Sequence, residues 1–151
     1  IKWVNDIYID GKKVCGILTE GASDFETGRL QYAVVGIGIN VTEPQGKFNA
    51  EIADIATAIY EKDVPWGIKN RLAAEVLNQF SEIMNAPDDK MVIDEYRSRS
   101  ILINKEVYII ENGEMKTVTV IDIDDTAAII LKTDNGEIIK KTSGEISIKV
   151  K

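Results

Sequence analysis

The 151-residue sequence contains no histidine, one cysteine and three prolines. The absence of histidine excludes a His-based catalytic triad and removes the commonest metal ligand. Cys15 cannot form a disulfide within the chain, which is typical of a reducing compartment, and we expect it to pack as a small apolar side chain. No apolar run approaches the roughly 20 residues of a membrane helix. We therefore predict a cytoplasmic protein that makes no membrane contact.

Basic residues are fewer than acidic ones. The chain has 18 lysines and arginines against 25 acidic residues, a net charge of −7. This balance argues against nucleic acid as a partner. Hydrophobic residues make up 44% of the sequence, which is enough for a sizeable core, and the length suits one ordinary domain or two small ones.

The first 40 residues hold three short runs rich in isoleucine, valine and tyrosine, which is the pattern of β-strands. Asp10 and Gly11 separate the runs 7–9 and 14–18, and this dipeptide is a strong signal for a hairpin. Because alternate residues of a strand share a face, we expect Lys13 and Cys15 on one face and Val14 and Gly16 on the other.

The run 34–39 is apolar apart from Gly36 and Gly38, and Asn40 follows it. A continuous apolar run predicts a central strand that is covered on both faces. Glycines inside a strand often mark the close approach of a ligand or another backbone. Glycines at i and i+2 leave one face of the strand without side chains. We therefore expect a sheet surface, edged with polar groups, on which another molecule binds.

The middle of the chain predicts loops and helices. We expect loops at 20–31 and 41–47, which contain glycine or proline. Apolar spacing then predicts three helices: one capped by Asn49, with Ile52, Ile55, Ala56 and Ile59 on one side; one from Pro65, with a stripe of Ile68, Leu72, Val76, Phe80 and Ile83 packed on the sheet; and one over 89–98, with Met91, Ile93 and Tyr96 inward.

The composition changes near residues 98–101, where Arg97 and Arg99 are interpreted as solvated or hinge charges. Five short β runs follow, at 105–111, 116–122, 126–132, 137–142 and 146–150, and their spacing predicts a small closed barrel. We therefore expect two domains, 1–99 and 100–151. At about 50 residues the second is marginally stable alone.

Several segments of the sequence, most of them within the first 40 residues, resemble the motifs of a known family. The segment KWVND (2–6) resembles the KWPND motif of biotin protein ligases, with Val4 in place of the proline. KKVCGIL (12–18) resembles that family's K-x-x-G-I-L strand, and GIGIN (36–40) its G-x-G-I-N strand. The segments 95–107 and 143–147 look like the family's linker and last strands. The resemblance implies an α+β fold: part of a mixed-sheet, class II synthetase-like catalytic domain followed by an all-β SH3-like barrel.

The resemblance also implies a reaction. Members of this family activate biotin with ATP and Mg²⁺ to biotinoyl-5′-AMP and transfer the biotin to a lysine of the biotin carboxyl carrier protein of acetyl-CoA carboxylase. By position, Lys13 would be the catalytic lysine. The other matching positions would contact biotin (Gly16, Gly36, Gly38, with Lys13) or the nucleotide (Trp3, Asn5, Asp6, Asn40), and Asp6 would support Mg²⁺ indirectly.

Other interpretations stay open. The chain begins directly on the KWVND motif, so we expect that upstream residues, including the family's Gly/Arg-rich loop, are absent and that the isolated chain is inactive. A non-catalytic module that binds proteins through the small barrel is one alternative, and a lipoate ligase relative is another. Whether a DNA-binding domain precedes these residues and whether the protein is a homodimer are not decided by the sequence.

Overall fold

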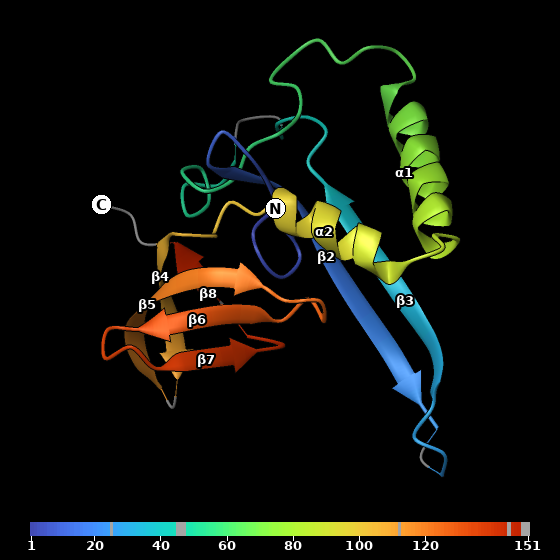
Figure 1. The fold of residues 1–151 in the computed structure, drawn as a ribbon. Helices are drawn as coiled ribbons and strands as arrows, with labels where there is room; N and C mark the ends of the chain where they lie inside the picture. The colour runs from blue at the N-terminus through green and yellow to red at the C-terminus, as the bar shows by residue number, and fades with distance from the viewer. Residues whose placement is uncertain (25, 45–47, 112, 145, 149–151) are drawn as a thin grey trace. The chain divides into compact units, whose positions relative to one another are not determined.

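The structure is a computed structural model that describes residues 1–24, 26–44, 48–111, 113–144 and 146–148 (Figure 1). The chain divides into two compact units, Asn5–Ala73 on one side and Ile1–Val4 with Ala74–Lys151 on the other. The predicted boundary between residues 99 and 100 refers to family domains and stays a prediction.

An antiparallel three-stranded sheet forms the centre of the unit Asn5–Ala73. Its strands are β1 (Asp6–Ile9), β2 (Lys12–Ser23) and β3 (Leu30–Ile39), in the order β1-β2-β3. The hairpin between β1 and β2 is confirmed: Asp10 and Gly11 have φ of 48° and 78°, the positive values that a two-residue turn requires.

β2 and β3 are longer than the sequence predicts. Pairing continues to Ser23 and Leu30, so residues 20–23, 30 and 31 of the expected loop are strand instead. Gly21 explains part of this difference, because a Cβ there would lie 3.0 Å from Leu30 Cδ1 and 3.2 Å from the Tyr32 carbonyl. The glycine that favours a loop in the sequence thus permits close packing within the hairpin.

A β-bulge interrupts the pairing of β1 with β2. The register joins Asp6 with Gly16, Ile7 with Cys15, and Tyr8 with Lys13. Val14 is therefore the extra residue, and a bulge of one residue moves every later side chain to the opposite face. Lys13 shares a face with Gly16, not with Cys15 as the regular alternation predicts. Val14 and Cys15 are both buried.

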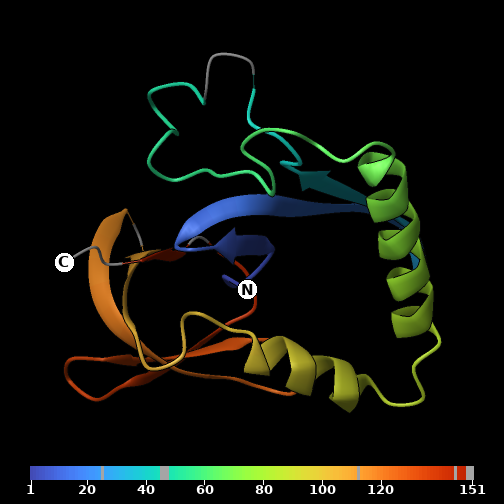
Figure 2. The same ribbon diagram turned by 90° about the horizontal axis from the view of Figure 1, so that it is seen from above.

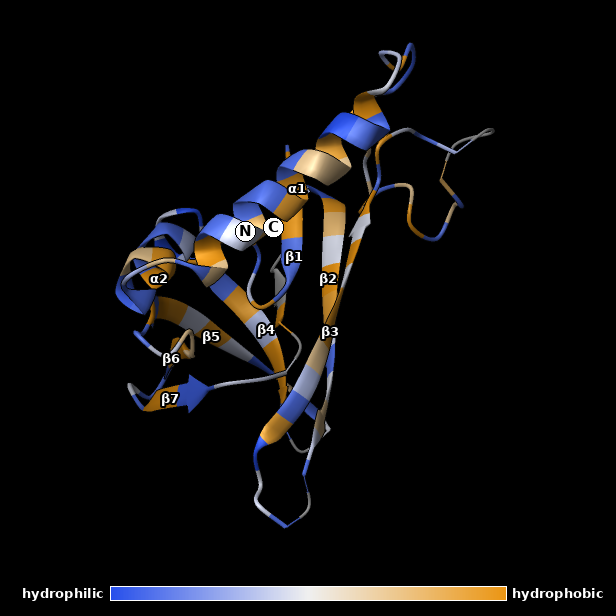
Figure 3. Ribbon diagram, turned by 90° about the vertical axis from the view of Figure 1, so that its right-hand side faces the viewer, coloured by the Kyte–Doolittle hydropathy of each residue, from blue (hydrophilic) through white to orange (hydrophobic). Residues whose placement is uncertain are grey.

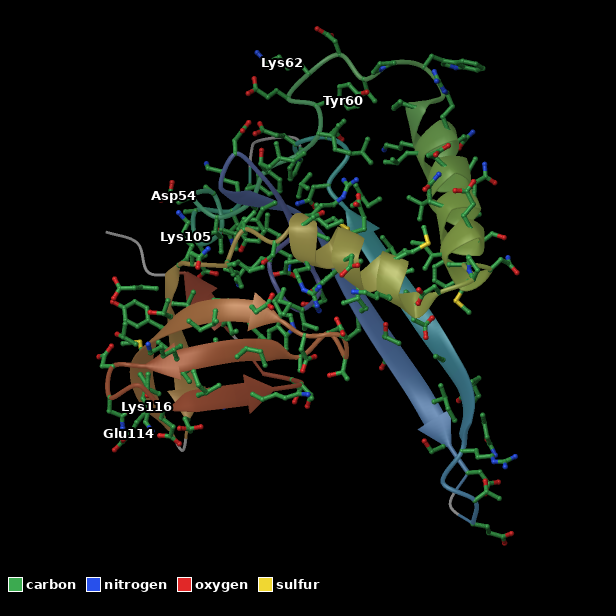
Figure 4. The ribbon with its side chains drawn as sticks, viewed as in Figure 1. Asp54, Tyr60, Lys62, Lys105, Glu114 and Lys116 are labelled. Atoms are coloured by element: carbon green, nitrogen blue, oxygen red, sulfur yellow. The ribbon has the colours of Figure 1, made fainter. Side chains whose placement is uncertain are left out.

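The helix predicted from Asn49 is wrong. Residues 50–55 form turns with local backbone bonds, and Ala56 forms an isolated bridge with Lys13 of β2. The Lys13 amide donates to the Ile55 carbonyl at 2.8 Å, and the Thr57 amide donates to the Lys13 carbonyl at 2.8 Å. The segment therefore extends the sheet beside Lys13. Asp54, Tyr60 and Lys62 lie on this long connection (Figure 4).

Apolar residues of β3 and of the next helix are exposed. β3 pairs with β2 alone among the described strands, and Val34 is 58% exposed, so the prediction that both faces are covered is wrong for this chain. Helix α1 (Ile68–Met84) begins three residues after the predicted start at Pro65, and none of its residues is buried. In the stripe that was expected to pack on the sheet, Phe80 is 43% and Ile83 is 50% exposed. Orange residues along α1, β2 and β3 mark these apolar positions (Figure 3).

The other unit combines helix α2 with a five-stranded antiparallel sheet in the order β7-β6-β5-β4-β8. Figure 2 shows α2 in yellow and the strands in orange to red. α2 (Asp89–Ser98) matches the prediction, and the Asp88 carboxylate caps it by accepting from the Lys90 amide at 2.8 Å. The strands also match in number and order: β4 (Glu106–Glu111), β5 (Glu114–Ile123), β6 (Ile129–Thr133), β7 (Ile138–Lys141) and β8 (Ile146–Ile148). Among the described residues β7 and β8 do not pair, so the closed barrel is observed as an SH3-like sheet.

This sheet encloses the main hydrophobic core. Fully buried residues include Leu102, Val107, Val120, Ile129 and Leu131. Trp3 and Tyr96 also pack on this core. Met91, predicted to point inward, is 64% exposed, because it lies on the side of α2 away from the core. No helix in the described parts of the chain is long and apolar enough to cross a membrane.

Arg97 ties the last turn of α2 to the end of β5. Its guanidinium donates to the Ile123 carbonyl at 2.5 Å and contacts Asp94 at 2.7 Å and Asp125 at 2.9 Å. The interpretation of Arg97 as a solvated charge is therefore wrong. A guanidinium with five donors can bond several acceptors at once. Arg99 is exposed and pairs only with Glu95 among the described residues.

We expect Leu131→Ala to lower the free energy of unfolding by about 2–5 kcal/mol, because it removes a fully buried side chain and leaves a cavity. Urea unfolding measures this difference. Ile138→Ala on the neighbouring strand is the matched control, since Ile138 is 58% exposed and should change stability little. Equal losses in both variants would contradict this placement of the core.

Tyr96 predicts a decline of stability in alkali. Burial raises the pKa of its phenol to about 12, and the hydroxyl donates to the Val4 carbonyl at 2.9 Å. The unfolded state loses this proton near pH 10, so the contribution is intact below about pH 10 and is lost as the pH rises toward 12. Urea unfolding between pH 9 and 12 should show a smaller decline in Tyr96→Phe. An equal decline in both proteins would contradict the shift.

Candidate functional site

A shallow groove lies on one face of the sheet formed by β1, β2 and β3. It has a volume of about 540 Å³, within the range of small-ligand sites. Its lining includes Asn5, Asp6, Lys13, Gly16, Gly36 and Gly38. Six of the eight residues predicted for the site are therefore brought together by this one surface. Trp3 and Asn40 do not line it.

Glycines form the floor of the groove. Gly16 pairs with Gly38, and Leu18 pairs with Gly36, so Gly16, Gly38 and Gly36 lie on the same face of neighbouring strands. A Cβ at Gly36 or Gly38 would meet only backbone oxygens, at 3.6 and 3.7 Å. These are ordinary contact distances. The described part of the chain therefore does not itself need glycine at either position, and the bare floor is space for another molecule.

An ion pair stands at one end of this floor. The Lys13 Nζ lies 2.5 Å from Asp6 Oδ1, and the two side chains are 43% and 16% exposed. A partly exposed ion pair contributes only about 0–1 kcal/mol to stability. A lysine ammonium group has three donors, so Lys13 can keep Asp6 and also bind the anionic group of a ligand.

Asn5 holds the edge of the groove through both its backbone and its side chain. Its Nδ2 donates to the Ile17 carbonyl at 2.6 Å, and its own carbonyl accepts from the Ile17 amide at 2.8 Å. This pairing continues β1 by one residue toward the start of the chain. Asn5 is exposed as a whole, although its side-chain nitrogen is bonded to Ile17.

Asn40 joins β3 to the connection that follows it. Its Nδ2 donates to the Thr57 carbonyl at 3.0 Å, and its backbone bonds Val14 and Ile59. These bonds give Asn40 a structural task at the end of β3. The predicted contact with a nucleotide stays a prediction.

Trp3 is nearly fully buried in the core of the other unit. Its Nε1 donates to the Ala127 carbonyl at 2.9 Å, and only 3% of its surface is exposed. Its expected role as a wall of the nucleotide site therefore has no support in its surroundings. The peptide bond between Trp3 and Val4 is cis.

Cys15, Tyr8 and Lys12 surround Lys13 without lining the groove. Burial is the main cause that raises the pKa of the Cys15 thiol, and Lys13 opposes it. Burial also raises the pKa of the Tyr8 phenol, and Asp6 adds to the effect. The Lys12 Nζ donates to the Ala53 carbonyl at 3.0 Å, away from the groove. Of the two adjacent lysines, Lys13 is thus the one directed to the site, a distinction that the sequence KK alone does not make.

The described residues hold no group of three or more histidine, cysteine or acidic side chains that could bind a metal ion. Asp6 supplies one carboxylate to the groove, and Lys13 already pairs with it. Mg²⁺ is commonly held by one or two carboxylates together with substrate phosphates. Among the described residues, the groove therefore provides no metal site of its own.

A second hollow, of about 770 Å³, lies along residues 64–71. It is formed by one consecutive segment around the fully exposed Trp66. No ion pair or converging polar side chains accompany it among the described residues. The glycine-floored groove is the better candidate, because separate strands bring charged and small residues together there.

Two family models match the sequence. The model "Biotin/lipoate A/B protein ligase family" matches residues 1–40, and the model "Biotin protein ligase C terminal domain" matches residues 102–149. The fold agrees with both. A biotin protein ligase from Aquifex aeolicus, in complex with biotin and ATP, superposes with a TM-score of 0.74 at 29% identity over 99% of this chain and 61% of the other. This chain belongs to the biotin protein ligase family.

Curated relatives agree with this assignment. The biotin–[acetyl-CoA-carboxylase] ligase of Mycobacterium tuberculosis is 28% identical over 97% of this chain and 52% of its own length. The bifunctional ligase/repressor BirA of Bacillus subtilis is 49% identical over 39% of this chain and 18% of its own length. The apo form of the Aquifex ligase gives a TM-score of 0.77, with 99% of this chain and 64% of that chain covered. The chain thus spans about half, or less, of the curated relatives that it matches.

The raised pKa of Cys15 predicts slow alkylation. We expect the native thiol to react with iodoacetamide far more slowly at pH 8 than the unfolded thiol, because burial limits both access and ionisation. Mass spectrometry of timed samples measures the rate. Cys15→Ala/Ser23→Cys, with a cysteine at an exposed position of the same strand, is the control and should react rapidly. Equal rates in the two native proteins would contradict the burial of Cys15.

Proposed function

We propose that this chain acts in the ATP-dependent attachment of biotin to protein, and that its groove binds biotinoyl-5′-AMP. The observation that supports the proposal most directly is the Lys13 ammonium group at the end of a glycine-floored groove. Lys13 also lies in the segment that matches the family model, and the KKVCGIL resemblance assigns it to the family's lysine position. The Aquifex ligase solved with biotin and ATP has the same fold.

The proposed reaction has two steps. A carboxylate oxygen of biotin attacks the α-phosphorus of ATP, the bond to pyrophosphate breaks, and biotinoyl-5′-AMP forms. The amine of a lysine on the carrier protein then attacks the acyl carbon, AMP leaves, and the amine loses a proton. Both reactants of the first step are anionic, so a fixed cation between them lowers their repulsion and stabilises the charge that develops. Lys13 is proposed to supply that cation and to hold the two groups in line.

The neighbouring residues receive supporting roles in this proposal. The floor at Gly36 and Gly38 admits the flat part of the ligand close to the backbone. Asn5 and Asp6 lie beside Lys13 in the groove and face the nucleotide. Asn40 supports the end of β3 and is a proposed nucleotide contact. Mg²⁺ would enter with the phosphates of ATP, since the described residues form no metal site.

The carrier is proposed to be the biotin carboxyl carrier protein of acetyl-CoA carboxylase. The Mycobacterium relative is named for that carboxylase. One of the two family models includes lipoate ligases, so lipoyl-5′-AMP is the appropriate comparison ligand. The match of residues 102–149 to the C-terminal domain of biotin protein ligases favours biotin.

Calorimetric titration with a non-hydrolysable analogue of biotinoyl-5′-AMP tests the proposal. We expect Lys13→Ala to weaken binding by at least about tenfold, because a hydrogen bond to a charged group contributes roughly 1.5–3 kcal/mol. Lys12→Ala is the matched control: it removes the same charge one residue away, and Lys12 is directed to the Ala53 carbonyl.

Three results would contradict the proposal: no binding by the folded wild-type chain, equal losses in Lys13→Ala and Lys12→Ala, or tighter binding of the lipoyl analogue than of the biotinoyl analogue. The last result would assign the groove to lipoate instead. Circular dichroism of each variant shows whether the fold is retained.

A further inference from the structure

The space for the Lys13 ammonium group exists because residue 16 has no side chain. A Cβ built on Gly16 would lie 3.1 Å from both Cε and Nζ of Lys13, and 3.6 Å from Asp6 Oδ1. The first two distances are shorter than an ordinary van der Waals contact. A methyl group at residue 16 would therefore require the end of the Lys13 side chain to move by a few tenths of an ångström.

The bulge at Val14 creates this proximity. In regular antiparallel pairing, Lys13 and Gly16 are three residues apart and face opposite sides of the sheet. The register places Asp6 opposite Gly16 and Tyr8 opposite Lys13, and paired residues share a face. Asp6 and Tyr8 are two residues apart on β1 and therefore lie on the same face of the sheet as each other. The extra residue thus brings Lys13, Asp6 and Gly16 to one surface.

We propose that Gly16 and Asp6 are positioning residues for Lys13. Because Gly16 has no side chain, it leaves space for the end of the lysine side chain, and Asp6 holds the ammonium group in that space. This inference rests on the proposed function only in giving Lys13 a ligand to bind. Gly16 then acts through the lysine, and not as part of the surface that contacts biotin. The ion pair restrains a long, flexible side chain before any ligand arrives, so less conformational freedom is lost on binding.

The backbone allows a test by substitution. Gly16 does not have the positive φ that would disfavour alanine, and the nearest atoms to the added methyl belong to the flexible end of Lys13. Gly16→Ala should therefore fold and displace the ammonium group. Gly38→Ala is the matched control, because Gly38 is paired with Gly16 and its added methyl would meet only the Gly16 carbonyl at 3.7 Å. It adds the same volume to the groove without touching Lys13.

The first measurement needs no ligand. In protein labelled with ¹³C,¹⁵N-lysine, the Cε–Hε and Nζ resonances of Lys13 are assigned by their loss in Lys13→Arg. We expect Gly16→Ala and Asp6→Asn to shift both resonances, and Gly38→Ala to leave them unchanged. Unchanged Lys13 resonances in Gly16→Ala, or equal shifts in Gly38→Ala, would overturn the proposal. This result is independent of whether the groove binds an adenylate.

The second measurement separates the two roles of Gly16. Gly16→Ala should weaken binding of the biotinoyl-5′-AMP analogue several-fold in the wild-type background and have no further effect in Lys13→Ala, because the effect passes through the lysine. A loss of the same size in Lys13→Ala would show that residue 16 contacts the ligand directly and would overturn the positioning role. If Gly16→Ala does not fold, recovery of folding in Gly16→Ala/Lys13→Ala supports the clash, and failure to recover contradicts it.

Discussion

The backbone pairing of β2 is the constraint on which the rest of the candidate site depends. β2 bonds β1 on one side and β3 on the other, and the segment around Ala56 bonds it beside Lys13. Each of these ladders fixes a register, and the registers decide which side chains share a face. A slip of one residue would turn Lys13 away from Asp6 and move Gly16 off the floor. The chemistry of the groove is therefore a consequence of hydrogen bonds that involve no side chain.

The small SH3-like unit follows a different logic. Its core is closed and fully buried, and polar contacts tie its elements at the rim, where Arg97 bonds the end of β5 and Lys140 pairs with Asp124 at 2.6 Å. Among the described residues of the unit Asn5–Ala73, only Val14 and Cys15 are buried hydrophobic residues. Burial supplies most of the folding free energy. The unit with the candidate site thus draws more of its order from strand pairing.

Local signals in the sequence predicted the elements well where a turn or a period determined them. Asp10-Gly11 predicted the first hairpin, and the 3.6-residue period predicted α1 and α2. The turns between short β runs predicted the order β4 to β8. The failures came from long-range pairing. Apolar spacing in residues 52–59 fits a helix as well as the turns that bond Lys13, and nothing local distinguishes the two. The bulge could not be predicted from the sequence either, because valine at position 14 is as typical of a regular strand as of a bulge. The residues gathered in the groove were found through the family resemblance, while their common face was found only in the structure.

The paired glycines of the floor also bear on how this groove can be altered. Gly36 and Gly38 meet only backbone atoms at ordinary contact distance, so each can accept a methyl group as far as the described residues are concerned. A larger residue there raises the floor without disturbing the hydrogen-bonded ladder beneath it. Gly36 and Gly38 are therefore suitable positions for redesign. A substitution to alanine would make the groove shallower, and a ligand smaller by the same volume would fit it. If the groove binds the proposed adenylate, such a variant would favour the smaller ligand over the unmodified one.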